Sequence, residues 1–184
     1  MKEFIDRESW QFINTFAPWL SALGTLGAVV VSLWLAHRRM SIRLKVSAGH
    51  RITVGQGIKP YPEYLLISVV NDSVRKARLA GIGWKIGWIK KRYAVQNTDI
   101  NLYSIRIPVD LDESEEAKFF IPLKGEADWL NNFARDLLGQ WPRLNCRSIK
   151  IQAWTSVGKT FESRIEAGLR QRILEAYFNA QNKK

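Results

Sequence analysis

Cysteine and histidine are scarce in this chain of 184 residues, which contains one cysteine and two histidines. A single cysteine excludes a disulfide scaffold and any metal site built from several thiolates. The two histidines, His37 and His50, leave little material for a histidine-based metal centre or a serine triad. The sequence therefore predicts no metal, no cofactor and no catalytic residue, and we expect that the protein is not an enzyme.

Acidic residues are also few, since the chain has 17 Asp and Glu against 28 Lys and Arg and a net charge of +11. The charge is segregated. Residues 38–92 hold 13 basic and two acidic residues and so carry the whole excess, whereas residues 93–131 hold three basic and eight acidic residues. Such a basic segment indicates an anionic partner, of which lipid head groups, nucleic acid and an acidic protein are the candidates.

Charge is absent altogether from residues 16–36, FAPWLSALGTLGAVVVSLWLA. At ~1.5 Å per residue, a helix of this length spans about 31 Å, the thickness of a bilayer hydrocarbon core. The stretch predicts a transmembrane helix over residues 16–37, after a short segment 1–15 and with Pro18 in its first turn. Four residues are expected at the membrane interface: Trp19, Trp34, Arg38 and Arg39.

A secretory signal peptide and the buried helix of a soluble protein are the alternatives for this stretch. A signal peptide has a basic start and a small-residue cleavage site. Here the start has mixed charge, and the apolar run ends in His37-Arg38-Arg39. A buried helix rarely lacks charge over 21 residues. A membrane anchor is therefore favoured over both alternatives.

The Lys and Arg residues on either side of this helix predict its orientation. Two precede it, and five follow it up to residue 51. By the positive-inside rule, the N-terminus lies outside and residues 38–184 lie in the cytoplasm.

Small residues form one stripe along the predicted membrane helix. Its members are Ser21, Gly24, Thr25, Ala28 and Ser32. Such a stripe lets two helix backbones approach closely, which predicts self-association or pairing with another membrane helix. The alternative is that small residues are simply common in membrane helices.

Residues 42–184 carry turn-forming residues every 8–15 positions, the spacing of a β-sandwich or barrel. Strands are predicted at 42–48, 50–54, 63–71, 78–89, 92–96, 102–107, 116–122, 147–156 and 159–165. Alternation within 82–88 predicts one buried strand face made of Ile82, Trp84, Ile86 and Trp88. Helices are predicted near 126–138 and 165–180, the second with an ion pair between Glu166 and Arg170. The expected fold class is all-β with minor helices, preceded by one N-terminal transmembrane α-helix.

The stretch NDSVRKARLAGIGWKIG at 71–87 follows the uncharged helix and its basic flank. Together with PVDLDESEEAKFFIPL at 108–123 and TSVGKTFESRI at 155–165, it resembles a recurrent type of bacterial and prophage protein. Those proteins are single-pass membrane proteins with a cytosolic immunoglobulin-like β-sandwich and no assigned activity. The resemblance covers the predicted anchor and most of residues 42–165, and it implies such a sandwich and a place in the bacterial inner membrane. We expect the sandwich domain to span residues 38–184. It also implies a host–phage role such as superinfection exclusion or defence, and it assigns no catalytic residue.

Three features that look reactive have a structural explanation. Gly158-Lys159-Thr160 lacks the glycine five positions earlier that a phosphate-binding loop needs, so a β-turn is expected. The acidic residues of 110–116 lack the glycine of a calcium loop. They are expected in a solvated turn that attracts basic residues of the same chain. Cys146 is expected to be a buried, inert thiol near the start of a strand.

Six basic residues are the candidates for binding an anionic partner: Arg43, Lys45, Lys85, Lys90, Lys91 and Arg92. Lipid head groups are favoured because the basic segment begins directly after the anchor, where anionic lipid is concentrated. Nucleic acid is the alternative, with Trp84, Trp88 and Tyr93 as stacking platforms. The sequence thus predicts an interaction or sensing module at the membrane, with a membrane-tethered nucleic-acid binder as the second hypothesis. Neither hypothesis identifies a protein partner.

Overall fold

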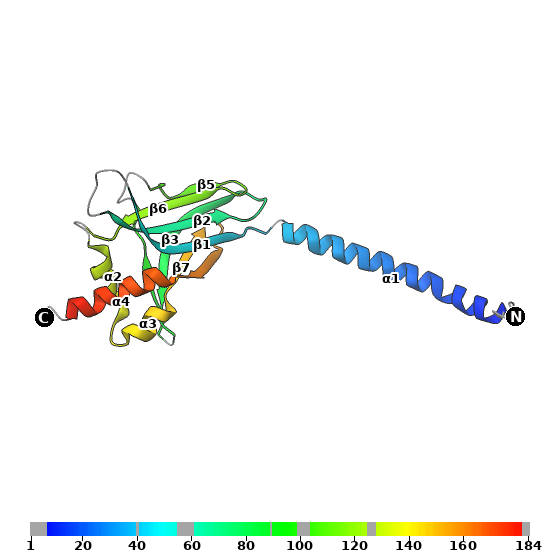
Figure 1. Cartoon of the computed structure of the whole chain (residues 1–184). Coiled ribbons are helices and arrows are strands. Elements are labelled where there is room, and N and C mark those ends of the chain that lie inside the picture. The colour runs from blue at the N-terminus through cyan, green and yellow to red at the C-terminus, as the bar shows by residue number, and fades with distance from the viewer. Residues whose placement is uncertain are drawn as a thin grey trace. The chain divides into compact units, whose positions relative to one another are not determined.

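The computed structural model describes residues 7–39, 41–54, 61–88, 90–98, 104–124 and 128–181. The chain divides into two compact units, Met1–Ser41 and Ile42–Lys184 (Figure 1).

The first unit is one helix, α1, which spans Arg7–Arg39. Its stretch Pro18–His37 has a mean hydropathy of 1.8 and no buried residue, so it is long and apolar enough to cross a membrane. The helix begins at Arg7, well before the predicted start. The expectation that Pro18 lies in the first turn is therefore wrong. Pro18 lies inside the helix, where its missing N–H removes one backbone hydrogen bond.

The second unit is built mainly from two antiparallel sheets. One has the order β1-β2-β6, with β1 at Leu44–Ile52, β2 at Glu63–Asn71 and β6 at Glu116–Pro122. The other has the order β4-β3-β7-β8, and β5 pairs with the beginning of β3. Its strands are β3 at Ala77–Ile86, β4 at Arg92–Val95, β5 at Val109–Leu111, β7 at Lys150–Thr155 and β8 at Thr160–Arg164. The prediction of a mostly β fold is thus confirmed.

Both sheets contribute to one hydrophobic core. Period-2 alternation places Leu65, Ile67 and Val69 of β2 on the buried face, and β1 and β6 follow the same rule. From the other sheet, Ile82 and Trp84 of β3 are almost fully buried. Burial of these side chains on folding is the main source of stability for the unit.

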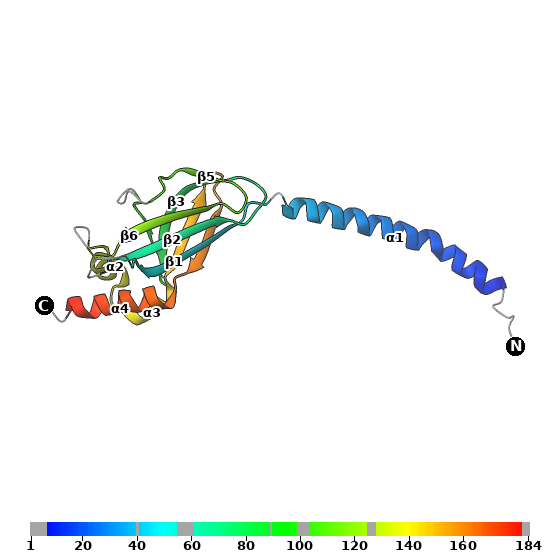
Figure 2. The same ribbon diagram turned by 45° about the horizontal axis from the view of Figure 1, so that its top comes forward.

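Three helices lie together at one end of the two sheets (Figures 1 and 2). They are α2 at Trp129–Leu138, α3 at Pro142–Ser148 and α4 at Ala167–Gln181. Helix α2 packs against β3 through aromatic side chains. The ring centre of Trp84 lies 5.0 Å from that of Phe133 and 5.7 Å from that of Trp129. The indole N–H groups of Trp84 and Trp129 both donate to Oε1 of Gln96, at 2.8 and 3.1 Å.

Several predicted boundaries were wrong, each for a local reason. The predicted strands 42–48 and 50–54 form one strand, β1, because Gly49 continues the pairing with β2 opposite Leu66. Residues 104–107 of the predicted strand 102–107 are not strand, and the rest of that range lies outside the described residues. Residues 147 and 148, predicted as strand, end helix α3. The helix predicted near 126–138 begins at Trp129, and 126–127 lie outside the described residues.

Trp88 also departs from its prediction. Strand β3 ends at Ile86, and Gly87 then takes a φ of +103°, a left-handed conformation that turns the chain. Trp88 is therefore not on the buried strand face with Trp84, and 71% of it is exposed. The predicted C-terminal helix is present as α4, with Leu169 and Ile173 fully buried. The predicted ion pair of Glu166 with Arg170 is wrong, since both Glu166 carboxylate oxygens accept hydrogen bonds from Arg51 at 2.7 Å.

Candidate functional site

Strand β3 connects two distinct ends of the second unit. Its first residue, Ala77, pairs with Leu111, whose carbonyl accepts a hydrogen bond from Asn71. Asp72, which follows Asn71 in the chain, donates its backbone N–H to the Arg43 carbonyl at 2.9 Å. This end of β3 therefore lies close to the first residues of the unit. We call it the Ile42 end. The other end of β3, at Ile86, is ~30 Å away along the strand at ~3.3 Å per residue and leads into the helices.

Basic residues at the Ile42 end are largely matched by carboxylates of the same chain. Lys45 lies 3.1 Å from Asp72, Lys76 lies 3.1 Å from Asp112, and Arg78 lies 3.8 Å from Asp110. The hydrogen bond to Asp112 raises the pKa of Lys76. Asp110 and Asp112 of the predicted acidic cluster thus pair with basic residues of the same chain, as predicted, although Asp110 lies in β5 and not in the turn after it. Arg43 is exposed at the same end.

Lys85 is matched in the same way, although its place on β3 was predicted to face an anionic partner. Its ammonium donates to Oε1 of Glu162, and Lys150 and Gln152 donate to the same carboxylate at 3.1 and 2.9 Å. These hydrogen bonds, that from Lys85 first, lower the pKa of Glu162 to about 2. We therefore leave Lys85 out of the candidate surface.

The remaining predicted cations are exposed: Lys90 and Lys91 lie in the connection from β3 to β4, and Arg92 is the first residue of β4. Lys90 and Arg92 line a groove of about 1110 Å³, whose other side is formed by residues of the α2–α3 connection and of α3. We call it the Trp88–Trp141 groove, after the two indoles that line it. Its lining consists of Gly87, Trp88, Lys90, Arg92, Gly139, Gln140, Trp141, Leu144 and Asn145. Of the described residues in that lining, none carries a carboxylate.

Apolar side chains in the groove are exposed to an unusual degree. Trp88 is 71% exposed, Trp141 is 67% exposed and Leu144 is 55% exposed. Large apolar groups gathered around one hollow mark an interaction site more often than isolated ones do. Trp141 and Leu144 were not predicted from the sequence, because they are distant in sequence from Trp88 and only the fold brings these segments together.

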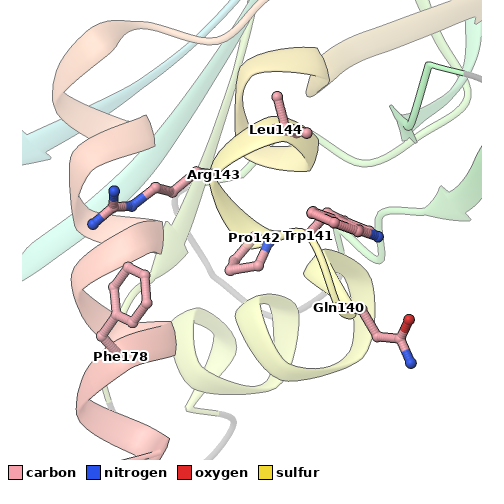
Figure 3. A pocket seen from close by; sticks show the side chains of 6 residues that line it. All are labelled: Gln140, Trp141, Pro142, Arg143, Leu144 and Phe178. Atoms are coloured by element: carbon pink, nitrogen blue, oxygen red, sulfur yellow. The ribbon is translucent and has the colours of Figure 1, made fainter.

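Trp141 also belongs to the lining of a second, smaller hollow of about 280 Å³. Figure 3 shows that the Arg143 side chain reaches toward Phe178 on α4, while the Trp141 indole points to the other side of the α3 start. The Arg143 guanidinium carbon lies 5.9 Å from the centre of the Phe178 ring, a cation–π contact. A fourth basic side chain thus lies next to the two hollows.

Hydrogen bonds fasten the frame of the groove on both sides. Gly87 N–H donates to the Ser148 hydroxyl at 2.8 Å, which ties the β3–β4 connection to α3. Asn145 Nδ2 donates to the Leu138 carbonyl at 2.6 Å, and the Tyr177 hydroxyl donates to the Gly139 carbonyl at 2.9 Å. The groove is therefore held between fixed backbone segments, which lowers the entropy cost of binding.

The predicted membrane residues all lie on α1. Trp19 and Trp34 are exposed, and the side chains of Arg38 and Arg39 lie outside the described part of the helix. The predicted small-residue stripe is exposed along its length: Ser21, Gly24, Thr25, Ala28 and Ser32. Thr25 Oγ1 lies 2.9 Å from the Ala22 carbonyl and 3.1 Å from the Ser21 carbonyl, so it satisfies its hydroxyl within the helix. The proposed helix pairing stays a prediction.

The other candidate groups occupy ordinary structural positions. Gly158 closes a β-turn between β7 and β8, because its N–H donates to the Thr155 carbonyl at 3.0 Å and its φ is +79°. The expected β-turn is thus confirmed, but it spans residues 155–158, and Thr160 already belongs to β8. His50 Nε2 lies 2.9 Å from Glu63 Oε2, and in the described part of the chain no three His, Cys, Asp or Glu residues are placed to hold a metal ion. Cys146 is 1% exposed, and burial raises the pKa of its thiol to about 11. It lies on helix α3, shortly before β7 begins at Lys150.

Comparisons with known proteins add little to this picture. No protein-family model matches the chain, and no curated protein matches it. One similar solved structure is described as "X-ray structure of Northeast Structural Genomics Consortium target SoR45", with 11% identity over 70% of this chain and 84% of that chain. The TM-score is 0.30, so this likeness carries no argument about fold or function.

Proposed function

We propose that the protein is a membrane-anchored interaction module, in which α1 spans the bacterial inner membrane and the second unit binds a partner. The Trp88–Trp141 groove is the observation that carries this proposal. Two exposed indoles, an exposed leucine and basic residues meet there on a hydrogen-bonded frame. Trp and Arg are the residues that dominate binding energy at protein interfaces.

The orientation in this proposal rests on the Lys and Arg bias around α1, which favours a cytoplasmic position for residues 38–184. Two antiparallel sheets around one core support the proposal that this domain is an immunoglobulin-like β-sandwich. With such a fold, the family resemblance favours a part in phage exclusion or defence. On this proposal, the partner is met at the cytoplasmic side of the membrane.

Anionic lipid is a second contact in the same proposal. Only Met40 and Ser41 stand between Arg39 and Ile42 in the sequence. On that chain distance, Arg38, Arg39 and the exposed Arg43 meet the lipid head groups, each contributing up to ~1 kcal/mol. Lys45 contributes less because Asp72 already pairs with it at 3.1 Å.

A topology assay tests the membrane part of the proposal. A fluorescent protein fused after Lys184 should be bright, and an alkaline phosphatase fused at the same place should be inactive, because phosphatase folds only outside the cytoplasm. The opposite pattern would place the domain outside the cytoplasm and refute this orientation. Recovery of the full chain in the soluble fraction would refute the anchor.

Site-specific photo-crosslinking tests the groove in cells. A photoreactive amino acid replaces Leu144 in the groove and, as a matched control, Val157 in the β7–β8 turn; both are exposed apolar residues, at 55% and 63%. The proposal expects a discrete adduct from position 144 and none from position 157. Equal adducts from the two positions, or none from position 144, would refute the groove as the interaction site.

A membrane-tethered nucleic-acid binder is the second candidate function. The exposure of Trp88 beside Lys90, Lys91 and Arg92 favours it, because bases stack on exposed rings near cations. Purification of the detergent-solubilised protein with and without nuclease separates the two candidates. Nucleic acid that co-purifies at low salt and is lost at high salt supports this second function.

A further inference from the structure

We propose that the Trp88–Trp141 groove binds an acidic protein segment that inserts an aromatic or aliphatic side chain between Trp88, Trp141 and Leu144. This inference rests on the proposed function and names the chemistry of the partner at that same site. Three observations carry it: the charge around the groove, the exposed apolar groups in it and its concave shape.

Charge around the groove is of one sign. Lys90 and Arg92 lie in the lining, and Lys91, Arg143 and Arg147 are exposed on the two segments that form it. Elsewhere in the domain, cations such as Lys45, Lys76 and Lys85 have carboxylate partners of the same chain. The described lining of the groove contains no carboxylate, so the carboxylates that pair with Lys90 and Arg92 come from a partner. Complementary charge of this kind raises the association rate and selects the partner.

The exposed apolar side chains of the groove require an apolar group in the partner as well as charge. Trp88, Trp141 and Leu144 are all more than half exposed, which leaves a large apolar area in water. Burial of such groups by a partner is favourable in proportion to the area removed from water. A purely acidic segment would leave the indoles and the leucine exposed. The segment must therefore carry at least one aromatic or aliphatic residue among its acidic ones.

Shape separates a protein segment from the other anionic partners. A bilayer surface is flat on the scale of the domain and would leave a hollow of about 1110 Å³ unfilled. A single nucleic-acid strand would stack bases on Trp88 and Trp141 and would gain little from Leu144, which has no ring. A protein segment uses all three groups, so the contribution of Leu144 distinguishes it from nucleic acid.

Selection from a random library tests the inference without a known partner. The full chain is placed in nanodiscs of neutral phosphatidylcholine and used to select from random 12-residue peptides displayed on phage. The enriched peptides should carry net negative charge and at least one aromatic or aliphatic residue. Binding of the best synthetic peptide should weaken at least tenfold in Trp141→Ala and in Leu144→Ala and stay unchanged in Val157→Ala. All three positions are exposed, so the variants are expected to fold.

Charge variants complete the test. The triple change of Lys90, Lys91 and Arg92 to Gln should weaken peptide binding at least fivefold. Peptide affinity for the parent protein should also fall as salt rises from ~0.05 to ~0.3 M, because the electrostatic screening length becomes shorter. Lys159→Gln, an exposed lysine in the β7–β8 turn, should have no effect. Enriched peptides without acidic excess would refute the inference while leaving the groove as an interaction site. Adducts absent from position 144 in the crosslinking experiment would refute both.

Two further probes test nucleic acid and anionic lipid as alternative ligands of the groove. A 12-nucleotide oligothymidine and vesicles containing phosphatidylglycerol are titrated against the same nanodisc preparation at equal salt. Either probe binding more tightly than the best selected peptide, and losing affinity in Trp141→Ala, would overturn the inference in favour of nucleic acid or lipid. Weaker binding of both supports the protein segment.

Discussion

The indole of Trp154 packs directly against the backbone of Gly81, its partner across the pairing of β3 with β7. A Cβ atom added at Gly81 would lie 2.3 Å from the Trp154 ring carbons Cε2 and Cζ2. Two residues along β3, a Cβ at Gly83 would lie 2.5 Å from the Ala94 carbonyl oxygen. The glycines that alternate with large apolar residues in β3 thus make room for a tryptophan on the second face of the strand.

Gly81→Ala should destabilise the domain by about 1–3 kcal/mol, the usual cost of forcing extra atoms into a packed site. Thermal unfolding of the full chain in detergent measures the loss. The control is Gly168→Ala near the start of α4, where an added Cβ meets nothing within 4 Å. That variant should be neutral or slightly stabilising, because alanine favours helix over glycine. Equal stabilities for Gly81→Ala and the parent protein would contradict the packing of Trp154.

Periodicity predicted the core of β3 because the buried residues Ile82, Trp84 and Ile86 follow the strand repeat. The same repeat gave a wrong prediction for Trp88, because the alternation of residue types does not reveal that the chain turns at Gly87 and leaves the strand. Helix α3 was missed for a similar reason. Pro142 follows the predicted helix 126–138, where proline is typical of a helix end, but here it is the first residue of α3, a position that proline also favours.

The candidate site could be predicted only in part. Lys90, Lys91 and Arg92 were found because they are a run of like charge. Trp141 and Leu144 have no sequence signal that links them to Trp88, since their proximity depends on the packing of α2, α3 and β3. The pairing of Lys85 with Glu162, which gives Lys85 a carboxylate partner within the chain, depends on the register of β3, β7 and β8.

Glu162 should make stability depend on pH in the acid range. Its pKa is lowered to about 2 by hydrogen bonds from Lys85, Lys150 and Gln152, against an ordinary value of 4.5. The carboxylate therefore stabilises the fold above pH 4.5, and this contribution is lost as pH falls through about 2. Glu162→Gln should lower the free energy of unfolding by about 1 kcal/mol near neutral pH, since the group is partly exposed.

The difference between the parent protein and Glu162→Gln should stay constant from pH 6 to about pH 4.5 and should then shrink as the pH falls to 2.5. Glu113→Gln, in the exposed turn before β6, serves as the matched control and should follow the parent at every pH. A difference that stays constant over this range would show that the Glu162 carboxylate is not held in its charged form by its neighbours.

Cys146 should resist alkylation in the folded protein. It is 1% exposed, and burial raises the pKa of the thiol to about 11, so almost none of it is thiolate at pH 8. Iodoacetamide should modify it at least a hundredfold more slowly than it modifies the new cysteine in Val157→Cys made in a Cys146→Ala background, as followed by intact mass. Both sites should react at similar rates in denaturant. Fast modification in the folded protein would reopen the interpretation of Cys146 as a nucleophile.

Copies of the protein should associate through the small-residue stripe of α1, and a substitution of Gly24 tests this prediction. An added Cβ at Gly24 meets nothing within 4 Å, so the helix has open space there for a second backbone. Gly24→Ile fills that space with a branched side chain, which should lower the dimer fraction of the full chain in bilayers by roughly threefold to tenfold. Insertion should be unaffected, because isoleucine favours the membrane interior.

Energy transfer between labelled copies of the full chain in vesicles measures this association as the protein is diluted in lipid. Leu26→Ile is the matched control, since at ~100° per residue it lies on nearly the opposite side of the helix from Gly24 and keeps the side-chain volume. Pairing through the stripe requires that Gly24→Ile weaken association while Leu26→Ile does not. If both variants associate like the parent protein, the small residues serve only as ordinary membrane-helix residues, and any pairing of the protein must come from another surface.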